Sequence, residues 1–215
     1  MTQVKICGLT DLSQALAAAE AGADYLGLVF AASRRQVLPE KAAEMAGAIH
    51  RAKSHPSLVG VFVNSPVQEV NRIANLCNLD WVQLSGTETW KYCEEIKRPI
   101  IKTVHVTAED SSREIIEYMK KGYHSISTDG LMYLLDTYIG GVHGGTGRTF
   151  SWQLAKEVAA VHPFIVAGGL TADNVDRLIE EVHPWGVDVS SGVELAGKKD
   201  IRKIREFIVK VKSQE

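Results

Sequence analysis

Apolar residues along this chain fall into two alternating patterns. Short runs that are apolar almost throughout are typical of strands buried on both faces, whereas apolar positions three or four residues apart are typical of helices with one buried face. Eight runs of the first kind predict strands at residues 4–8, 25–30, 58–63, 81–84, 100–104, 131–135, from 164 onward and 186–189. A segment of the second kind follows each run, so the pattern predicts a repeat of strand and helix.

The first helical segment shows the second pattern clearly, because Leu12, Ala15 and Ala19 fall on one face and Thr10 stands before them as a candidate cap. Pro39 suits the first turn of the second helix, since a proline there loses no hydrogen bond. The other predicted helices lie near residues 70–77, 90–96, 108–121, 152–161, 175–182 and 201–208.

Strands that alternate with helices form parallel sheets, because each helix returns the chain to the start of the next strand. Eight such units closed into a ring make a (β/α)8 TIM barrel, an α/β fold for which 215 residues is a short but sufficient length. A doubly wound open sheet is the alternative, although it usually contains fewer units. We therefore predict a single (β/α)8-barrel domain that covers residues 1–215.

Composition gives more information about the possible binding partners of the chain than about its fold. Charged residues make up 23% of the chain and the net charge is −2, which argues against nucleic acid or a membrane as a partner. The three cysteines have neither the even number of a disulfide framework nor the spacing of a zinc site. Cys77 and Cys93 lie on helix stripes and are expected to be structural. No signal segment is recognised, so a cytoplasmic location is expected.

Two late strands end in small residues. The run from residue 164 breaks into Gly168 and Gly169, and the run from residue 186 breaks into Ser191 and Gly192. Small residues let backbone N–H groups approach an anion closely, and barrels bind phosphate after strands seven and eight. We therefore predict that these turns bind the phosphate of a small molecule, with simple connecting turns as the alternative.

Catalytic side chains of barrel enzymes lie at the carboxyl ends of the strands. Cys7 and Asp136 end the first and sixth strands, Gln83 and Asp188 lie in the fourth and eighth, and Arg35 follows the second. A thiol near a positive charge has a lowered pKa and can act as a base, whereas a carboxyl group enclosed by apolar residues stays protonated and can act as an acid. A cysteine that only fills space and an aspartate that only caps a loop are the alternatives.

Two lysines lie within predicted strands. Lys5 points towards the barrel interior, where Asp188 is a candidate partner. A structural ion pair is the expectation, and a Schiff-base lysine at Lys5 or Lys102 is the alternative. His105 and His143 are expected to be solvated loop residues.

Eight short motifs occur in order along the chain, at residues 4–10, 33–37, 60–64, 82–84, 134–136, 144–147, 167–170 and 188–194. Together, at this spacing, they resemble the phosphoribosylanthranilate isomerases of tryptophan biosynthesis over nearly the whole chain. The resemblance implies a barrel enzyme that acts on a small-molecule phosphosugar and needs neither a metal ion nor an organic cofactor. Whether it works as a monomer or a homodimer stays open.

The resemblance also implies roles for particular residues. The family's general base matches Cys7, its general acid matches Asp136, and the arginine that binds the anthranilate carboxylate matches Arg35. Gln83 and Asp188 are then expected to contact the substrate. The implied reaction is the Amadori rearrangement of N-(5-phosphoribosyl)anthranilate.

Two departures from the family pattern leave alternatives open. Ser85 stands where the family usually has a histidine, and the loop after the second strand is slightly shorter than in some members, so Arg34 competes with Arg35. One rival function is another phosphosugar barrel enzyme, either a lysine-dependent aldolase or the related isomerase of histidine biosynthesis. The other rival is a non-catalytic barrel that binds a phosphorylated ligand, with Ser85 as a sign of lost activity.

Overall fold

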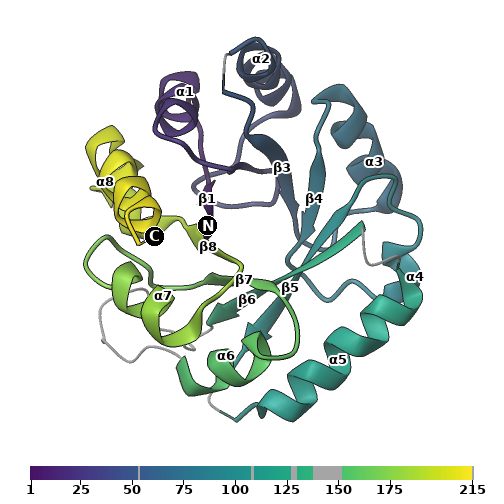
Figure 1. The fold of residues 1–215 in the computed structure, drawn as a ribbon. Helices are drawn as coiled ribbons and strands as arrows, with labels where there is room; N and C mark the ends of the chain where they lie inside the picture. The colour runs from purple at the N-terminus through teal and green to yellow at the C-terminus, as the bar shows by residue number, and fades with distance from the viewer. Residues whose placement is uncertain (53, 108, 127–129, 138–151, 215) are drawn as a thin grey trace.

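The computed structural model describes residues 1–52, 54–107, 109–126, 130–137 and 152–214. In this part of the chain eight parallel strands pair in sequence order and close into a barrel, and Figure 1 shows the helices arranged around it. The strands are β1 (Gln3–Cys7), β2 (Tyr25–Val29), β3 (Ser57–Phe62), β4 (Trp81–Leu84), β5 (Ile100–Val106), β6 (Leu131–Thr137), β7 (Phe164–Ala167) and β8 (Gly186–Val189). The predicted (β/α)8 barrel is confirmed, and the open sheet is excluded.

The helices that follow these strands are α1 (Leu12–Glu20), α2 (Pro39–His50), α3 (Val67–Leu76), α4 (Trp90–Cys93), α5 (Ser112–Ser125), α6 (Trp152–Ala159), α7 (Val175–Val182) and α8 (Ile201–Lys212). The motif at residues 144–147 and His143 lie outside the described residues. None of the helices in the described ranges is long and apolar enough to cross a membrane.

Two helices begin later than the sequence pattern predicts. The cap of α1 is Asp11 rather than Thr10, because its carboxylate accepts a hydrogen bond from the backbone N–H of Ser13. The cap of α5 is Ser111, whose side chain and that of Glu114 each bond to the other's backbone N–H. This reciprocal pair satisfies two N–H groups at the helix start, so α5 begins at residue 112 and not near 108.

Elements near the mouth of the barrel are also longer or more numerous than predicted. β5 continues two residues beyond the predicted end at 104, to Val106, and β6 continues from 135 to Thr137. A 3-10 turn (Ser191–Val193) and a small hairpin of β9 (Glu194–Leu195) with β10 (Lys198–Lys199) follow β8. These additions bring His105, Glu194 and Lys199 to the carboxyl ends of the strands.

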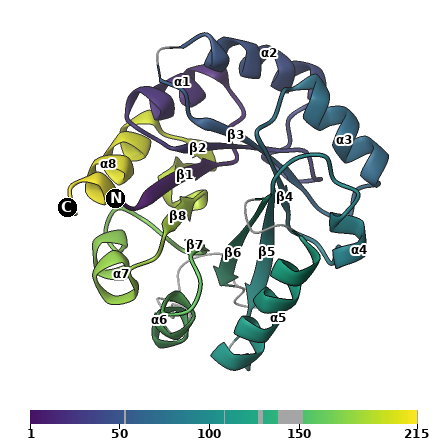
Figure 2. The same cartoon turned by 45° about the vertical axis from the view of Figure 1, so that its right-hand side comes forward.

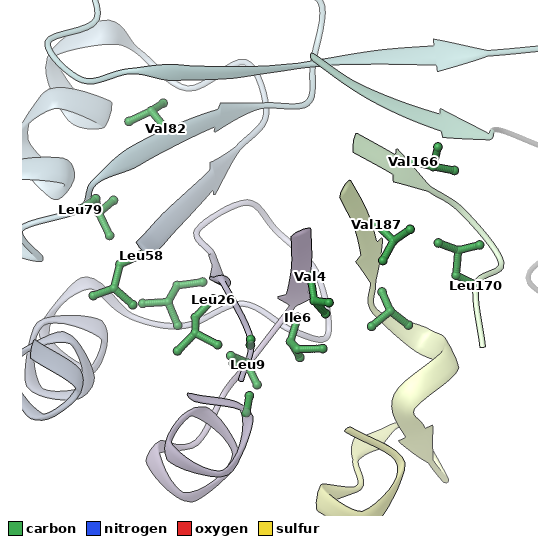
Figure 3. Close-up of a cluster of buried hydrophobic side chains, with 14 of the residues drawn as sticks. Val4, Ile6, Leu9, Leu26, Leu58, Leu79, Val82, Val166, Leu170 and Val187 are labelled. Carbon is green, nitrogen blue, oxygen red and sulfur yellow. The ribbon is translucent and has the colours of Figure 1, made fainter. Parts of the chain in front are cut away.

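The core has two layers because successive strand residues face opposite sides. The larger layer lies between strands and helices, and Figure 3 shows part of it, where Ile6, Leu26 and Leu58 pair across β1, β2 and β3. The smaller layer fills the barrel with Val59, Ile101, Leu134, Ile165 and Ala167. Residues two positions further along the same strands, such as Thr103 after Ile101 and Asp136 after Leu134, therefore also face the barrel axis.

The ring closes where the two ends of the chain meet. β1 pairs with β8, and α8 packs beside α1, as the turned view in Figure 2 shows. Lys212, the last residue of α8, places Nζ 2.8 Å from Oδ2 of Asp24, next to the start of β2. This closure sets β1 and β8 side by side, and both carry residues of the candidate site.

Candidate active site

A buried ion pair lies in the barrel where β1 and β8 meet. The strand register pairs Lys5 with Asp188, and Nζ of Lys5 lies 3.1 Å from Oδ1 of Asp188. The Lys5 side chain is only 1% exposed. Burial alone lowers the pKa of Lys5, but Asp188 and the Cys7 thiol outweigh burial and raise it. The expected ion pair is therefore confirmed, and Lys5 is held as an ammonium ion.

Cys7 lies at the end of β1, two residues beyond Lys5 on the same face of the strand. Burial is the largest influence on its thiol and raises its pKa, while Lys5 and Lys199 act in the opposite direction and Asp188 adds to burial. The net pKa is raised, so the prediction of a lowered thiol pKa is wrong. The thiolate form is nevertheless supported by two ammonium groups, which a purely structural cysteine does not require.

Asp136 lies near the end of β6 and is 40% exposed. Burial by surrounding groups raises its pKa, and Asp188 adds to this effect, while His105 and Lys5 partly offset it. A raised carboxyl pKa is the direction that a general acid needs, because the group keeps its proton to a higher pH.

Gln83 belongs to a small polar network on β4 and β5. Its Nε2 donates to Oγ of Ser85 at 3.0 Å and lies 3.4 Å from Oγ1 of Thr103, and these two hydroxyls are 2.9 Å apart. Its Oε1 is buried and has no hydrogen-bond partner in the described part of the chain. An acceptor left free in this way is available to a substrate hydroxyl group. Ser85 thus takes part in a network that orients Gln83.

Arg35 lies beside the end of β1, since its Cδ is 2.4 Å from where a side chain on Gly8 would begin. Two of its three guanidinium nitrogens bond to Glu194, with Nε 2.6 Å from Oε1 and Nη2 3.1 Å from Oε2, which among the described residues leaves Nη1 and the second N–H of Nη2 for a ligand. Arg34 also reaches Glu194 but is far more exposed. The structure therefore brings Arg35 to the mouth and fixes its guanidinium plane, while Arg34 lies further out.

Glu194 and Lys199 lie between Arg35 and the surroundings of Cys7. Lys199 Nζ lies 3.1 Å from Oε1 of Glu194 and 2.8 Å from the backbone oxygen of Ser190. Burial lowers the pKa of Lys199, and Glu194 and Cys7 partly restore it. For Glu194, burial is outweighed by Arg35 and Lys199, so its pKa is lowered and it stays ionised. One carboxylate therefore fixes both an arginine and an ammonium group near Cys7.

The two predicted phosphate turns touch one another. Gly168 and Gly169 have φ values of 96° and 64°, which favour glycine. A side chain on Gly192 would begin 1.8 Å from the carbonyl oxygen of Leu170, so only glycine fits this contact. Ser191 starts the 3-10 turn and is exposed. The structure thus brings all four predicted residues to adjoining turns after β7 and β8.

Lys102 lies on the other face of β5 from the inner residue Ile101. Its Nζ is 2.7 Å from Oε2 of Glu88 and 3.1 Å from the backbone oxygen of Gly86. This buried pair lies between the strand and the helix layer, so Lys102 is not part of the candidate site. In the described part of the chain no three His, Cys, Asp or Glu residues are grouped to hold a metal ion.

Three residues near the site are not indicated by the hydrophobic pattern of the sequence. His105 lies in β5 and pairs in register with Asp136, so the expected loop position is wrong, although its side chain is exposed as expected. A longer fifth strand would have indicated this neighbour, because parallel strands in register bring such residues together. Glu194 and Lys199 depend on the hairpin after β8, for which the hydrophobic pattern gives no signal.

Known proteins match both the sequence and the fold. A sequence profile described as N-(5'phosphoribosyl)anthranilate (PRA) isomerase matches residues 4–210. The N-(5'-phosphoribosyl)anthranilate isomerase of Dehalococcoides mccartyi is 45% identical over 215 residues, which cover 100% of this chain and 98% of the relative. The crystal structure of phosphoribosyl anthranilate isomerase from Thermotoga maritima has a TM-score of 0.86 at 35% identity and covers 99% of this chain and 100% of that chain.

A further solved structure of such an isomerase is in complex with reduced 1-(o-carboxyphenylamino)-1-deoxyribulose 5-phosphate. It has a TM-score of 0.81 at 33% identity and covers 99% of this chain and 100% of that chain. Sequence and fold therefore agree along almost the entire length, and the mouth of the barrel carries a carboxyl group, a thiol and an arginine. The chain belongs to the N-(5'-phosphoribosyl)anthranilate isomerase family.

Proposed function

We propose that Cys7 and Asp136 carry out the proton transfers of the reaction that defines this family. That reaction is the Amadori rearrangement of N-(5-phosphoribosyl)anthranilate to 1-(2-carboxyphenylamino)-1-deoxyribulose 5-phosphate, a step of tryptophan biosynthesis. It rearranges one molecule without adding or removing atoms. One catalytic group must therefore start with a proton to donate, and the other must be ready to accept one.

The first step takes place at the ring oxygen of the ribose. Protonated Asp136 donates its proton to this oxygen, the bond from C1′ to the ring oxygen breaks, and the nitrogen lone pair forms the C=N bond of a Schiff base. The Cys7 thiolate then removes the proton from C2′, the released electron pair forms the C1′=C2′ bond of an enolamine, and the π pair of the C=N bond returns to the nitrogen. Finally the C2′ hydroxyl returns a proton to Asp136 while the Cys7 thiol protonates C1′, which gives the ketone and restores both groups.

The observation that carries this proposal is the shared position of both groups around the Lys5–Asp188 pair. Asp188 acts with burial to raise the pKa of Asp136, which favours its protonated form. Lys5 lies beside Cys7 and favours the thiolate against the effect of burial. A single buried ion pair thus supports opposite starting states in the acid and the base, as the reaction requires.

The same geometry supports a binding mode for the substrate. Arg35 has the planar, bidentate donor set that fits the anthranilate carboxylate, and Glu194 holds its guanidinium group in place. The free Oε1 of Gln83 is available to accept a hydrogen bond from a ribose hydroxyl. Asp188, which uses Oδ1 for Lys5, is proposed to contact the ribose as well.

We place the 5-phosphate at the adjoining turns after β7 and β8. The amides of Gly168, Gly169, Ser191 and Gly192 are the proposed donors, because small residues allow close approach of the backbone. In the closed barrel only β1 separates β8 from β2, the strand before Arg35, so donors for both anionic ends of the substrate lie on this side of the mouth. Phosphate would then fix the substrate while Cys7 and Asp136 act on the ribose.

The acid and base assignments are tested by following the fluorescence of the anthranilate substrate as it is consumed. We expect Cys7→Ser and Asp136→Asn each to lower kcat by about 10²–10⁴-fold, which is the usual contribution of a general acid or base. Binding of the substrate should be retained, because neither side chain is proposed to hold a charged end of it. Cys77→Ser, which alters the buried cysteine directly after α3, is the matched control. A rate near that of the wild-type protein in either site variant would refute its assignment.

A lysine-dependent aldolase is less well supported. Lys102 is paired with Glu88 outside the barrel interior, and Lys5 is held as an ammonium ion by Asp188. A Schiff-base lysine instead needs a neutral amine, so neither lysine is suitably prepared. The reaction as written needs no metal or organic cofactor, and a cytoplasmic enzyme that is monomeric or homodimeric remains our expectation. One solved relative from Thermotoga maritima is described as a dimeric isomerase from which monomers were made.

A further inference from the structure

His105 lies beside the proposed general acid, and the steps described above do not use it. The register of β5 and β6 pairs His105 directly with Asp136. Paired residues on adjacent parallel strands point to the same face, so both side chains emerge at the barrel mouth. Nδ1 of His105 lies 3.8 Å from Oδ2 of Asp136. Catalytic groups are often this far apart without substrate and approach one another when it binds.

The second ring nitrogen determines where the imidazole carries its hydrogen. Nε2 of His105 lies 2.9 Å from the backbone oxygen of Ser85, and a carbonyl oxygen can only accept a hydrogen bond. Nε2 must therefore carry a hydrogen, and in the neutral ring Nδ1 then keeps its lone pair. The end of β4 thus selects the tautomer in which Nδ1 faces Asp136 as an acceptor.

We propose that His105 is a positioning residue for Asp136, which orients the carboxyl group and keeps its transferable proton on the His105–Asp136 pair. This inference rests on the proposed role of Asp136 as the acid. Neutral His105 accepts a hydrogen bond from protonated Asp136, and protonated His105 attracts the Asp136 carboxylate. Both arrangements hold one proton and both are attractive, so the pair retains a proton that either group alone would lose more readily.

Charged groups on the helix side of His105 compensate one another. Glu88 and Lys102 line the same cavity as His105, but they form an ion pair 2.7 Å long. Tyr118 of α5 also lines this cavity, and burial raises its pKa to about 12, so it is neutral at physiological pH. None of these three supplies an uncompensated charge to the imidazole. Asp136 is therefore the ionisable side chain that faces Nδ1 of the imidazole.

Charged groups on the barrel side of the His105–Asp136 pair change the pKa of Asp136. Asp188 raises the pKa of Asp136 and Lys5 lowers it, and these two residues are themselves paired. Protonated His105 lowers the pKa of Asp136 for the first proton to leave. The second proton leaves at a higher pH than it would from Asp136 alone, because two sites can hold it. Loss of His105 should therefore move the alkaline limb of activity to lower pH.

The kinetic test compares His105→Phe with His105→Gln. Glutamine can still donate to the Ser85 carbonyl oxygen, but neither replacement can be protonated. We expect His105→Phe to lower kcat by about tenfold, a part of what a general acid contributes, with KM within about twofold of the wild-type value. His105→Gln should recover part of kcat, while the alkaline limb of kcat shifts to lower pH in both variants. His124→Gln, which changes an exposed histidine of α5, is the matched control.

The second test measures the pair without turnover. Titration of the His105 ring by NMR should give a lower imidazole pKa in Asp136→Asn than in the wild-type protein, because the variant lacks the carboxylate. An identical His105 pKa in both proteins would overturn the pairing. An unchanged kcat and alkaline limb in His105→Phe, or a change in KM alone, would overturn the positioning role. If the His105 pKa differs between the two proteins but Asp136→Asn keeps the wild-type rate, the acid role of Asp136 is refuted instead.

Discussion

The reactivity of Cys7 depends on charges that other elements supply. Burial raises its thiol pKa, and Lys5 and Lys199 oppose this effect. Lys5 comes from the same strand, whereas Lys199 comes from β10, where Glu194 and Ser190 hold its ammonium group. The thiol pKa of the proposed base therefore depends in part on a hairpin that contributes no strand to the barrel itself.

Replacement of Lys199 tests this electrostatic support. Lys199→Met removes a positive charge near Cys7, so the thiol pKa should rise further and alkylation of Cys7 by iodoacetamide should require a higher pH. Peptide mass spectrometry would separate Cys7 from the other cysteines. Lys198→Met is the matched control, because this neighbouring lysine is exposed. Equal pH dependence of Cys7 alkylation in Lys199→Met and the wild-type protein would show that Lys199 does not act on the thiol.

A contact between two residues could be predicted from the sequence where the alternation of side chains along the strands is enough to bring them together. Lys5 and Asp188 could be paired from the sequence, because both face inward and β1 must meet β8 in a closed barrel. The raised pKa of Cys7 could not be predicted, because it depends on the extent of burial, which exceeds the effect of two nearby ammonium groups. Spacing identifies neighbours, but it does not give the balance between desolvation and charge.

At the scale of elements, the turns after β7 and β8 form one packed unit. Gly192 lies against the carbonyl oxygen of Leu170, and Nδ2 of Asn174 donates to the backbone oxygen of Gly169 at 3.0 Å while its Oδ1 accepts from Thr171 N–H at 2.9 Å. Each turn therefore limits the movement of the other. A rigid pair of turns is useful for phosphate binding, since the amide donors are ordered before the anion arrives.

Gly192→Ala tests whether this packing serves phosphate binding. The new methyl group would begin 1.8 Å from the Leu170 carbonyl oxygen, so the two turns must separate. We expect KM to rise by about tenfold or more, equivalent to about 1.4 kcal/mol of binding free energy, with a much smaller change in kcat. Inorganic phosphate should also become a weaker competitive inhibitor. Gly47→Ala is the control, because the new methyl group in α2 would have only ordinary contacts. An unchanged KM in Gly192→Ala would contradict the proposed phosphate position.

The order and type of the barrel elements could be predicted from the sequence, whereas their ends could not. Hydrophobic periodicity locates strands because their central residues are buried, but His105 and Asp136 lie at ends where polar side chains replace apolar ones. The hairpin after β8 has strands of only two residues, which are too short to show a period. Barrel enzymes place their chemistry at these strand ends, so the site is harder to predict than the fold.

At the scale of the whole molecule, buried ion pairs occupy different layers. Lys5 and Asp188 are paired inside the barrel, and Lys102 and Glu88 are paired between β5 and the helices. The inner pair lies beside the proposed acid and base, whereas Lys102 lies on the opposite face of its strand. The outer pair should therefore contribute to folding more than to catalysis. It connects β5 to the loop before α4, since Glu88 also accepts from the backbone N–H groups of Asn64 and Gly86.

Glu88→Gln tests this separation of folding from chemistry. Burial raises the pKa of Glu88, but Lys102 and the Asn64 N–H outweigh burial and lower it below the ordinary value of 4.5. Stability from this carboxylate is thus fully present above pH 4.5 and is lost as the pH falls through its lower folded pKa. At pH 7 we expect Glu88→Gln to lower the free energy of unfolding by about 3–5 kcal/mol, because Lys102 stays buried without its partner.

Urea unfolding at a series of pH values measures this effect. The difference between Glu88→Gln and the wild-type protein should narrow in acid, where the wild-type carboxylate is itself protonated, while kcat of the folded variant stays close to the wild-type value. Glu117→Gln, which breaks an exposed ion pair with Lys120 on α5, is the control and should change stability little. A difference that is constant from neutral to acid pH would show that the Glu88 charge is not what stabilises the fold. A large fall in kcat of the folded variant would instead show that the outer pair takes part in catalysis.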